Sequence, residues 1–240
     1  MNTVRIDDYL TLLSQFLQVP RRDLQAFCDD LVRADDFLAE LNQIISGVPG
    51  FQGTHFHHVA DLRAYRSLLY LVTRVAQPDV FVETGVLNGF SSAFILLAME
   101  HNAKGKLISI DLPTSDPRIL RQGTGEIPAG KETGWAIPDA LRRRHELRLG
   151  PAEVLLPTAF AELRSADIFL HDSDHSYTHM MLELSLAWQF VRRGGWILVD
   201  NIEQNHAFAD FVRATDARSM VVNSFVRPER TWSHGIIERP

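Results

Sequence analysis

Cysteine is almost absent from this chain of 240 residues, which contains only Cys28. A single cysteine excludes a disulfide framework within the chain and fits a reducing compartment, so we expect a cytoplasmic protein. The first residues lack the basic start and apolar run of a signal peptide. No stretch approaches the roughly 20 consecutive apolar residues that a membrane-spanning helix needs, so no membrane partner is expected.

Positive charge is also scarce, with 24 Lys and Arg against 30 Asp and Glu and a net charge of −6. Nucleic-acid binding needs clustered basic side chains, so we do not expect a nucleic-acid partner. The local exception, Arg142, Arg143 and Arg144, fits one exposed helical turn better than a binding groove. The apolar fraction of 45% is ordinary for a globular protein.

Two kinds of pattern divide the chain near residue 60. Residues 1–59 read as a helical extension or cap, which includes a long helical stretch over about 22–45. Residues 60–240 read as one α/β domain, because apolar β-branched runs alternate there with helical segments. Helices are predicted over 60–76, 91–99, 139–144, 152–163, 179–191 and 205–217. Parallel strands are predicted over 79–83, 106–110, 146–149, 167–170 and 195–199, followed by an antiparallel pair over 219–226 and 231–238.

The turn after the first predicted strand, from Glu83 to Gly89, reads Glu-Thr-Gly-Val-Leu-Asn-Gly. Ligands of open α/β sheets bind at the carboxyl ends of the strands, where this turn would lie. Gly85 allows a sharp turn, and Gly89 allows a ligand to approach the backbone. Ser91 or Ser92 can cap the next helix, whose amides face the ligand. The Gly-x-x-x-Gly spacing counts against a dinucleotide and leaves Glu83 near a cationic ligand, although an ordinary βα turn explains the glycines equally well.

Asp111 ends the second predicted strand, about 20 residues beyond the glycine turn. An acid at this position is placed to accept hydrogen bonds from both hydroxyls of a ribose. Aspartate often ends strands, so the residue is informative mainly in combination with the turn. Together the two features predict a nucleoside site.

Carboxylates gather where the fourth and fifth predicted strands end. The acidic and amide side chains there are Asp172, Asp174, Asp200 and Asn201. Such a set suits Mg²⁺, Mn²⁺ or Ca²⁺, and His175 beside it can act as a base near neutral pH. Helix and turn capping by Asp174, Ser176 or Asn201 explains one or two of these residues but not the whole set.

Residues 60–238 resemble a class I S-adenosylmethionine (SAM)-dependent methyltransferase, similar to the macrocin/catechol-type small-molecule O-methyltransferases of methyltransferase family 24. The resemblance rests on the turn at 83–92, Asp111, the Asp-x-Asp-His-Ser-Tyr segment at 172–177 and Gly-Gly-Trp-x-Leu-x-Asp-Asn at 194–201. It implies a Rossmann-like, doubly wound seven-stranded sheet of order 3-2-1-4-5-7-6 with strand 7 antiparallel. In relatives, N-terminal helices often cover the substrate or form a dimer, so a homodimer or higher homo-oligomer is expected.

The resemblance also implies roles for individual residues. SAM would contact Glu83, Thr84, Gly85, Asn88, Gly89, Ser91, Asp111, Ala152, Glu153 and Asp172. Mg²⁺ or another divalent cation would be held by residues from the set Asp172, Asp174, Asp200 and Asn201. His171 stands where catechol-type enzymes are more often acidic, which leaves open whether Asp172 or Asp174 is the first ligand. Asp172 and His175 are the candidate catalytic residues, with His175 as the base, and residues 134–138 are expected beside the cofactor.

Three functions compete on this evidence. The first is metal-assisted O-methylation of a small molecule, as in natural-product biosynthesis. The others are a metal-independent N- or O-methyltransferase, and a catalytically inactive binding subunit with the same fold. An NAD-dependent oxidoreductase fits less well, because of the glycine spacing and the Asp200-Asn201 pair.

Several remaining features are less specific. The loop over 112–138 is long enough to be a lid or a binding loop. His55, His57 and His58 have no acidic or cysteine partner nearby and read as loop histidines rather than as a metal site. Trp188, Phe190 and Trp196 are expected in the core. Trp232 and His234 fit either the active site or packing.

Overall fold

The computed structural model describes residues 6–51, 56, 65–118, 127–227 and 230–240. The three histidines at 55, 57 and 58, the start of the helix predicted over 60–76 and part of the 112–138 loop lie outside the described residues. Among the described helices, none combines the length and apolar character needed to span a membrane.

The core of the fold is one seven-stranded sheet, and its strand order β3-β2-β1-β4-β5-β7-β6 confirms the predicted order. The five strands from β3 to β5 are parallel, and β7 runs antiparallel to both β5 and β6, also as predicted. The strands are β1 (Val80–Thr84), β2 (Lys106–Asp111), β3 (His145–Leu149), β4 (Ala166–His171), β5 (Val191–Val199), β6 (Ser219–Arg227) and β7 (Arg230–Glu238). Parallel neighbours bring the carboxyl ends of β1, β2, β4 and β5 to one edge of the sheet.

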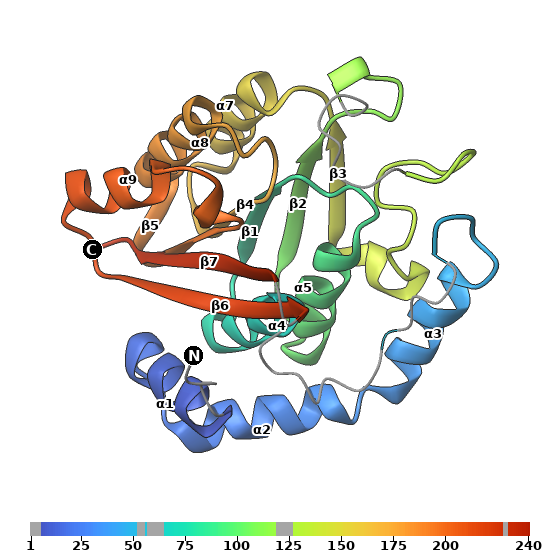
Figure 1. Ribbon diagram of the computed structural model, residues 1–240, viewed down its shortest axis with the longest axis horizontal. Helices are drawn as coiled ribbons and strands as arrows, with labels where there is room; N and C mark the ends of the chain where they lie inside the picture. Colours follow the sequence, from blue (N-terminus) through green and yellow to red (C-terminus); the bar gives the residue numbers. More distant parts are fainter. Residues whose placement is uncertain (1–5, 52–55, 57–64, 119–126, 228–229) are drawn as a thin grey trace.

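Helices cover both faces of the sheet, with α7, α8 and α9 on one side and α4 and α5 on the other (Figure 1). The helices described in full after β1 are α5 (Phe90–His101), α7 (Ala152–Leu163), α8 (Tyr177–Phe190) and α9 (Ala207–Thr215), with 3-10 turns η1 (Asp139–Arg144) and η2 (Ile202–Gln204). Trp188, Phe190 and Trp196 pack within these layers, as expected for core residues.

The N-terminal helices α1 (Ile6–Leu17), α2 (Arg21–Val32) and α3 (Asp35–Ile45) wrap below α4 (Tyr65–Ala76) and α5 (Figure 1). Their buried side chains, such as Leu24 and Leu41, share one hydrophobic core with Leu68 and Phe94. The division of the chain at residue 59 stays a prediction.

Two differences from the predicted elements exceed two residues among the described boundaries. The helical stretch predicted over 22–45 is two helices, because Ala34 has a non-helical ψ of 47°. Acidic residues then begin α3, where they suit the positive end of the helix dipole. The strand β5 begins at Val191 rather than near 195. Val191 already pairs with Ala166 of β4, and after an interruption around the left-handed Gly194 (φ 71°) the pairing resumes at Trp196.

Candidate active site

A cavity of about 1190 Å³ opens at the carboxyl ends of β1, β2, β4 and β5. This volume exceeds that of a typical single-ligand pocket, so two small molecules fit side by side. Of the predicted site residues, those that line it are Gly85, Asn88, Ser91, Asp111, Ala152, Glu153, Asp172, Asp174, His175, Asp200 and Asn201. The loop from 49 to 51, before α4, contributes a further wall.

Gly85 joins the ends of β1 and β4 in a way that no other residue permits. Its φ is +83°, and a Cβ atom there would lie 1.9 Å from the backbone oxygen of Asp172. The Gly85 amide also donates to the carbonyl of Ile110 at 2.9 Å. The glycine therefore lets three strand ends converge at the cavity.

The side-chain position of Gly89 is occupied by a neighbouring segment, and the predicted approach of a ligand to its backbone stays a prediction. A Cβ atom there would lie 2.6 Å from Cγ1 of Ile137 and 3.0 Å from Cα of Gly134. The space beside Gly89 is thus filled by the segment from Gly134 to Ile137, and not by open cavity. This segment hydrogen-bonds to the turn, with the Ala136 amide donating to the carbonyl of Asn88 at 3.0 Å. It supports the turn from behind.

Asp111 lines the cavity and also closes the glycine turn. One carboxylate oxygen accepts the amides of Val86 and Leu87, each at 2.7 Å, and the other accepts the amide of Leu112 at 2.7 Å. Burial raises the pKa of Asp111, against the lowering effect of these three amides. Oδ1, which accepts one amide, keeps a lone pair, so a ribose hydroxyl can still donate to Asp111 there.

Glu83 and Thr84 are not among the described residues that line the cavity, and they lie behind its wall. One oxygen of Glu83 accepts the hydroxyls of Ser92 and Ser109, at 2.5 and 2.6 Å, and the other is buried without a hydrogen-bond partner. Burial raises the pKa of Glu83 to about 7, although both serines lower it. Thr84 donates to Glu183 of α8 at 2.6 Å.

Asp172, His175 and Asp200 form the one group in the described chain that could hold a metal ion, with ligand atoms within 4.8 Å of one another. The His175 Nε2 atom lies 3.8 Å from Asp172 Oδ1 and 4.0 Å from Asp200 Oδ2. That nitrogen is buried and has no hydrogen-bond partner. Two convergent carboxylates and an unpartnered nitrogen fit a divalent cation.

The electrostatics of this group favour a positive ligand. Burial and the neighbouring charge of Asp200 raise the pKa of Asp172 well above its usual value. The pKa of Asp200 is lowered instead, because contacts with His234, Asp172 and His175 outweigh its burial. Burial and the charge of His171 lower the pKa of His175, which keeps this imidazole neutral at neutral pH and its lone pair free.

The two further predicted ligands differ in what they do. Asp174 accepts the amide of Ser176 at 2.9 Å, whereas Ser176 itself caps α8 by accepting the amide of His179 at 3.4 Å. Asp174 lines the cavity but lies outside the three-residue group. Asn201 is left-handed (φ 51°), and its Oδ1 atom is buried with no hydrogen-bond partner. An unpartnered buried oxygen there is available to a ligand.

His171 turns away from the cavity toward a buried carboxylate that the sequence did not reveal. Its Nδ1 atom lies 2.5 Å from Glu183 Oε2. Glu183 also accepts Ser173 at 2.9 Å and His179 at 2.9 Å, in addition to Thr84. Glu183 thereby ties α8 to the ends of β1 and β4.

Tyr65, the first residue of α4, and His234 of β7 contact the carboxylates of the site, although they are far apart in the sequence. Their rings stack at 4.2 Å, and the Tyr65 hydroxyl lies 3.5 Å from Asp172 Oδ2. The His234 Nδ1 atom lies 2.5 Å from Asp200 Oδ1, without hydrogen-bond alignment, and its Nε2 pairs with the Ser224 hydroxyl at 2.6 Å. Of the two readings left open for His234, the structure therefore supports proximity to the site.

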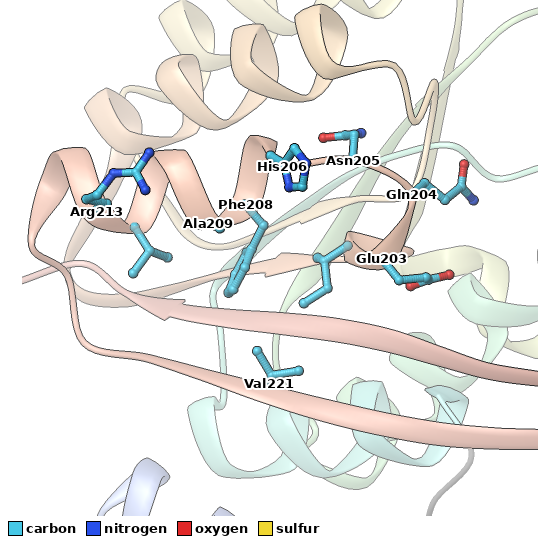
Figure 2. Close-up of a pocket in the computed structure, with 10 residues that line it drawn as sticks. Glu203, Gln204, Asn205, His206, Phe208, Ala209, Arg213 and Val221 are labelled. Carbon is cyan, nitrogen blue, oxygen red and sulfur yellow. The ribbon is translucent and has the colours of Figure 1, made fainter.

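A second hollow of about 740 Å³ lies between α9 and β6. Figure 2 shows Phe208 of α9 and Val221 of β6 both pointing into the space between these elements. Its wall is largely apolar, and it contains none of the residues predicted for the active site.

The strand order and the acidic carboxyl edge of the sheet define the class of protein. This combination is that of class I SAM-dependent methyltransferases. Residues 82–202 match the model of methyltransferase family 24, which describes a methyltransferase domain. The match covers half of the chain, and the chain belongs to this family. No curated protein matches the sequence.

Solved structures share the fold at low sequence identity. The O-methyltransferase TomG from Streptomyces achromogenes, solved with SAM, has a TM-score of 0.56 at 15% identity, over 85% of this chain and 90% of that one. The Bacillus cereus O-methyltransferase, solved with S-adenosylhomocysteine (SAH), has 0.54 at 15% identity, over 85% and 91%. A Klebsiella pneumoniae O-methyltransferase has 0.53 at 17% identity, over 85% and 88%. These likenesses establish the fold.

Proposed function

We propose that this methyltransferase transfers the methyl group of SAM to a hydroxyl of a small molecule, assisted by a divalent cation. The observation that carries the proposal is the convergence of Asp172, His175 and Asp200 beside the glycine turn. The cofactor occupies the side of the cavity lined by Gly85, Asp111 and residues 150–153, and the acceptor the side lined by the carboxylates.

The cofactor assignment is supported by the shape and charge of the turn. The proposed SAM contacts on the cavity wall are Gly85, Asn88, Ser91, Asp111, Ala152, Glu153 and Asp172. Glu83, Thr84 and Gly89 act through the turn, since each is held behind the wall by hydrogen bonds or packing.

Asp172 and Asp200 hold the cation, and the unpartnered oxygen of Asn201 lies beside them on the cavity wall. A divalent cation held there would supply Lewis acidity that lowers the pKa of a substrate hydroxyl. Neutral His175 takes the hydroxyl proton at Nε2. The chain aligns the acceptor oxygen with the methyl group, and such alignment supplies much of the acceleration of a displacement reaction.

Calorimetry and a turnover assay test the proposal. Wild type is expected to bind SAH and Mg²⁺ and to convert SAM to SAH with hydroxylated small molecules. Asp200→Asn should lose Mg²⁺ binding and turnover but keep SAH binding. Asp139→Asn, at a fully exposed position, should leave Mg²⁺ binding, turnover and SAH binding unchanged. Full activity in excess EDTA, without a tightly held ion, would refute the metal role.

His175→Ala separates the base from a third metal ligand. If His175 is the base, the substitution abolishes turnover and leaves the Mg²⁺ affinity unchanged. If His175 is a metal ligand, the substitution weakens Mg²⁺ binding by about tenfold or more, as is usual for metal ligands and their supporting contacts.

The second candidate is a metal-independent methyltransferase. The close approach of His234 to Asp200 favours it, because this imidazole occupies one carboxylate oxygen of the group. In that mechanism His234→Ala abolishes turnover and EDTA has no effect. An inactive binding subunit would instead bind SAH but would not convert SAM to SAH in the turnover assay.

Residues 1–59 are proposed to form the cap of the acceptor pocket. Pro49, Gly50 and Phe51 line the cavity, which supports a role in acceptor binding. A homodimer is proposed from the resemblance alone, and light scattering of the purified chain tests it.

A further inference from the structure

Arg66, the second residue of α4, lines the active-site cavity and has no hydrogen-bond or ion-pair partner in the part of the chain that the structure describes. Its Nε atom is fully buried. Arginine carries five N–H donors. Arg66 is only partly buried, but its buried Nε–H group is costly to leave unpaired unless a ligand accepts its hydrogen bond.

Aromatic rings hold the guanidinium in place without using its donors. The Cζ atom lies 5.6 Å from the centre of the Phe90 ring and 5.8 Å from that of Phe56. Such cation–π contacts leave the N–H groups in the plane of the guanidinium free to bind another molecule. Burial lowers the pKa of Arg66, against the favourable charges of Asp172, Tyr65 and Asp200.

Arg118 provides the comparison within the same cavity. It pairs with Asp116 at 2.8 Å and with Glu153 at 3.1 Å. Of the two arginines on the described cavity wall, Arg66 alone lacks a carboxylate partner. The wall is otherwise acidic, through Asp111, Asp172, Asp174, Asp200 and Glu153, so a monoanion is favoured over a dianion such as phosphate.

We propose that Arg66 binds a carboxylate of a small-molecule ligand held in this cavity, through the two-pronged geometry that guanidinium and carboxylate share. The inference rests on the proposed function, which supplies two sources of that carboxylate. One is the methionine part of the cofactor, because Phe90 directly follows the glycine turn. The other is an acidic methyl acceptor, because Asp172 and Asp200 are the charged neighbours of Arg66.

The first arm of the test compares SAH with its decarboxylated analogue, which keeps the amine. If the cofactor is the source, wild type prefers SAH about 10- to 100-fold, the range for a charge-assisted hydrogen-bonded pair. Arg66→Gln removes the preference by weakening SAH alone, and Arg66→Lys keeps part of it. Arg22→Gln, at an exposed position outside the cavity, is the matched control and keeps it fully.

The second arm uses protein saturated with SAH and Mg²⁺ and compares 3,4-dihydroxybenzoate with catechol. If the acceptor is the source, wild type prefers the acid by a similar factor, and Arg66→Gln abolishes that preference. Thermal unfolding of each variant verifies folding, and the wild-type preferences stand without any variant.

The proposal is overturned if wild type favours the carboxylated ligand in neither arm, or if Arg66→Gln keeps every preference that wild type shows. Failure of the cofactor assignment in the proposed function looks different. In that case wild type binds neither adenosyl ligand, and the carboxylate inference falls with it.

Discussion

Glu183 offers a sharp test of how the active-site edge is held together. It is completely buried in α8 and accepts hydrogen bonds from Thr84, His171, Ser173 and His179. Substitution by alanine leaves these donors without their acceptor in a buried environment.

The expected cost follows from the contacts. Removing one partner of a buried charged network costs about 3–5 kcal/mol, because the remaining groups stay buried and unpaired. In a chain of 240 residues, each kcal/mol shifts the melting temperature by about 2–4 °C. Glu183→Ala should therefore lower the melting temperature by roughly 6–20 °C. Glu183→Gln keeps the volume and one acceptor and should cost less, about 1–3 kcal/mol.

Urea unfolding followed by tryptophan fluorescence measures both variants. Glu162→Ala is the control, since Glu162 is half exposed and forms an ion pair with Arg148 at 2.8 Å. An exposed ion pair contributes about 0–1 kcal/mol. A cost for Glu183→Ala no greater than for Glu162→Ala would refute the account.

The pH dependence adds a second criterion. Burial raises the pKa of Glu183, but the contacts with His171 and His179 outweigh it and hold the pKa below its usual value. The stability that Glu183 contributes is thus present above its unfolded pKa of about 4.5 and is lost as the pH falls further. The hydrogen bond to Glu183 raises the pKa of His179, whose contribution is present below about pH 6.5 and lost as the pH rises. The difference between wild type and Glu183→Gln should therefore be largest near pH 5.5, and a difference that is the same at pH 3.5, 5.5 and 8.5 contradicts this assignment.

Three further predictions concern the turn. Gly85→Ala should destabilise the fold by more than about 2 kcal/mol in urea unfolding, because its Cβ would overlap the backbone of Asp172 and its φ is left-handed. Asp111→Ala should weaken SAH binding in calorimetry by at least about tenfold, since it frees two turn amides as well as removing the ribose contact. Glu83→Gln should remove the loss of stability that wild type shows as the pH rises from about 4.5 to 7, because the pKa of Glu83 in the folded chain is about 7. Unfolding curves at pH 5.5 and 8 check this, and parallel losses in both proteins would count against it.

The strand order and the edge of the sheet that carries the site could be predicted from the sequence because their signals are local. Apolar runs that end in Glu83, Asp111 or Asp172 identify strands and their carboxyl ends within a few residues. The handedness of the crossovers then brings these ends to one edge.

Tyr65 and Arg66 gave no such signal, and the sequence left His234 open between the active site and packing. Tyr65 reaches Asp172 across 107 residues of sequence, and its stacking with His234 depends on the antiparallel return of β7. Read alone, these residues have ordinary helix and strand positions. Their place in the site comes from tertiary packing, which no local pattern reports.

The direction of the strand-end side chains is a more instructive case. Successive residues of a strand point to opposite faces of the sheet. Glu83 accordingly meets Ser92 of α5, whereas Thr84 meets Glu183 of α8. His171, the last residue of β4, likewise points into the α8 layer.

On β1, β4 and β5 a side chain opens to the cavity when it follows the last paired residue, whereas on β2 the paired Asp111 itself lines the cavity. Asp172 and Asp200, each the first residue after its strand, fulfil this condition, and Glu83 and His171 do not. A carboxylate displaced by one residue along the same strand therefore changes from ligand binding to support of the wall. On this reasoning, the double variant His171→Asp, Asp172→His, which exchanges the two residues, should lose the metal site. Mg²⁺ calorimetry on that variant tests the point, and binding equal to wild type would refute it.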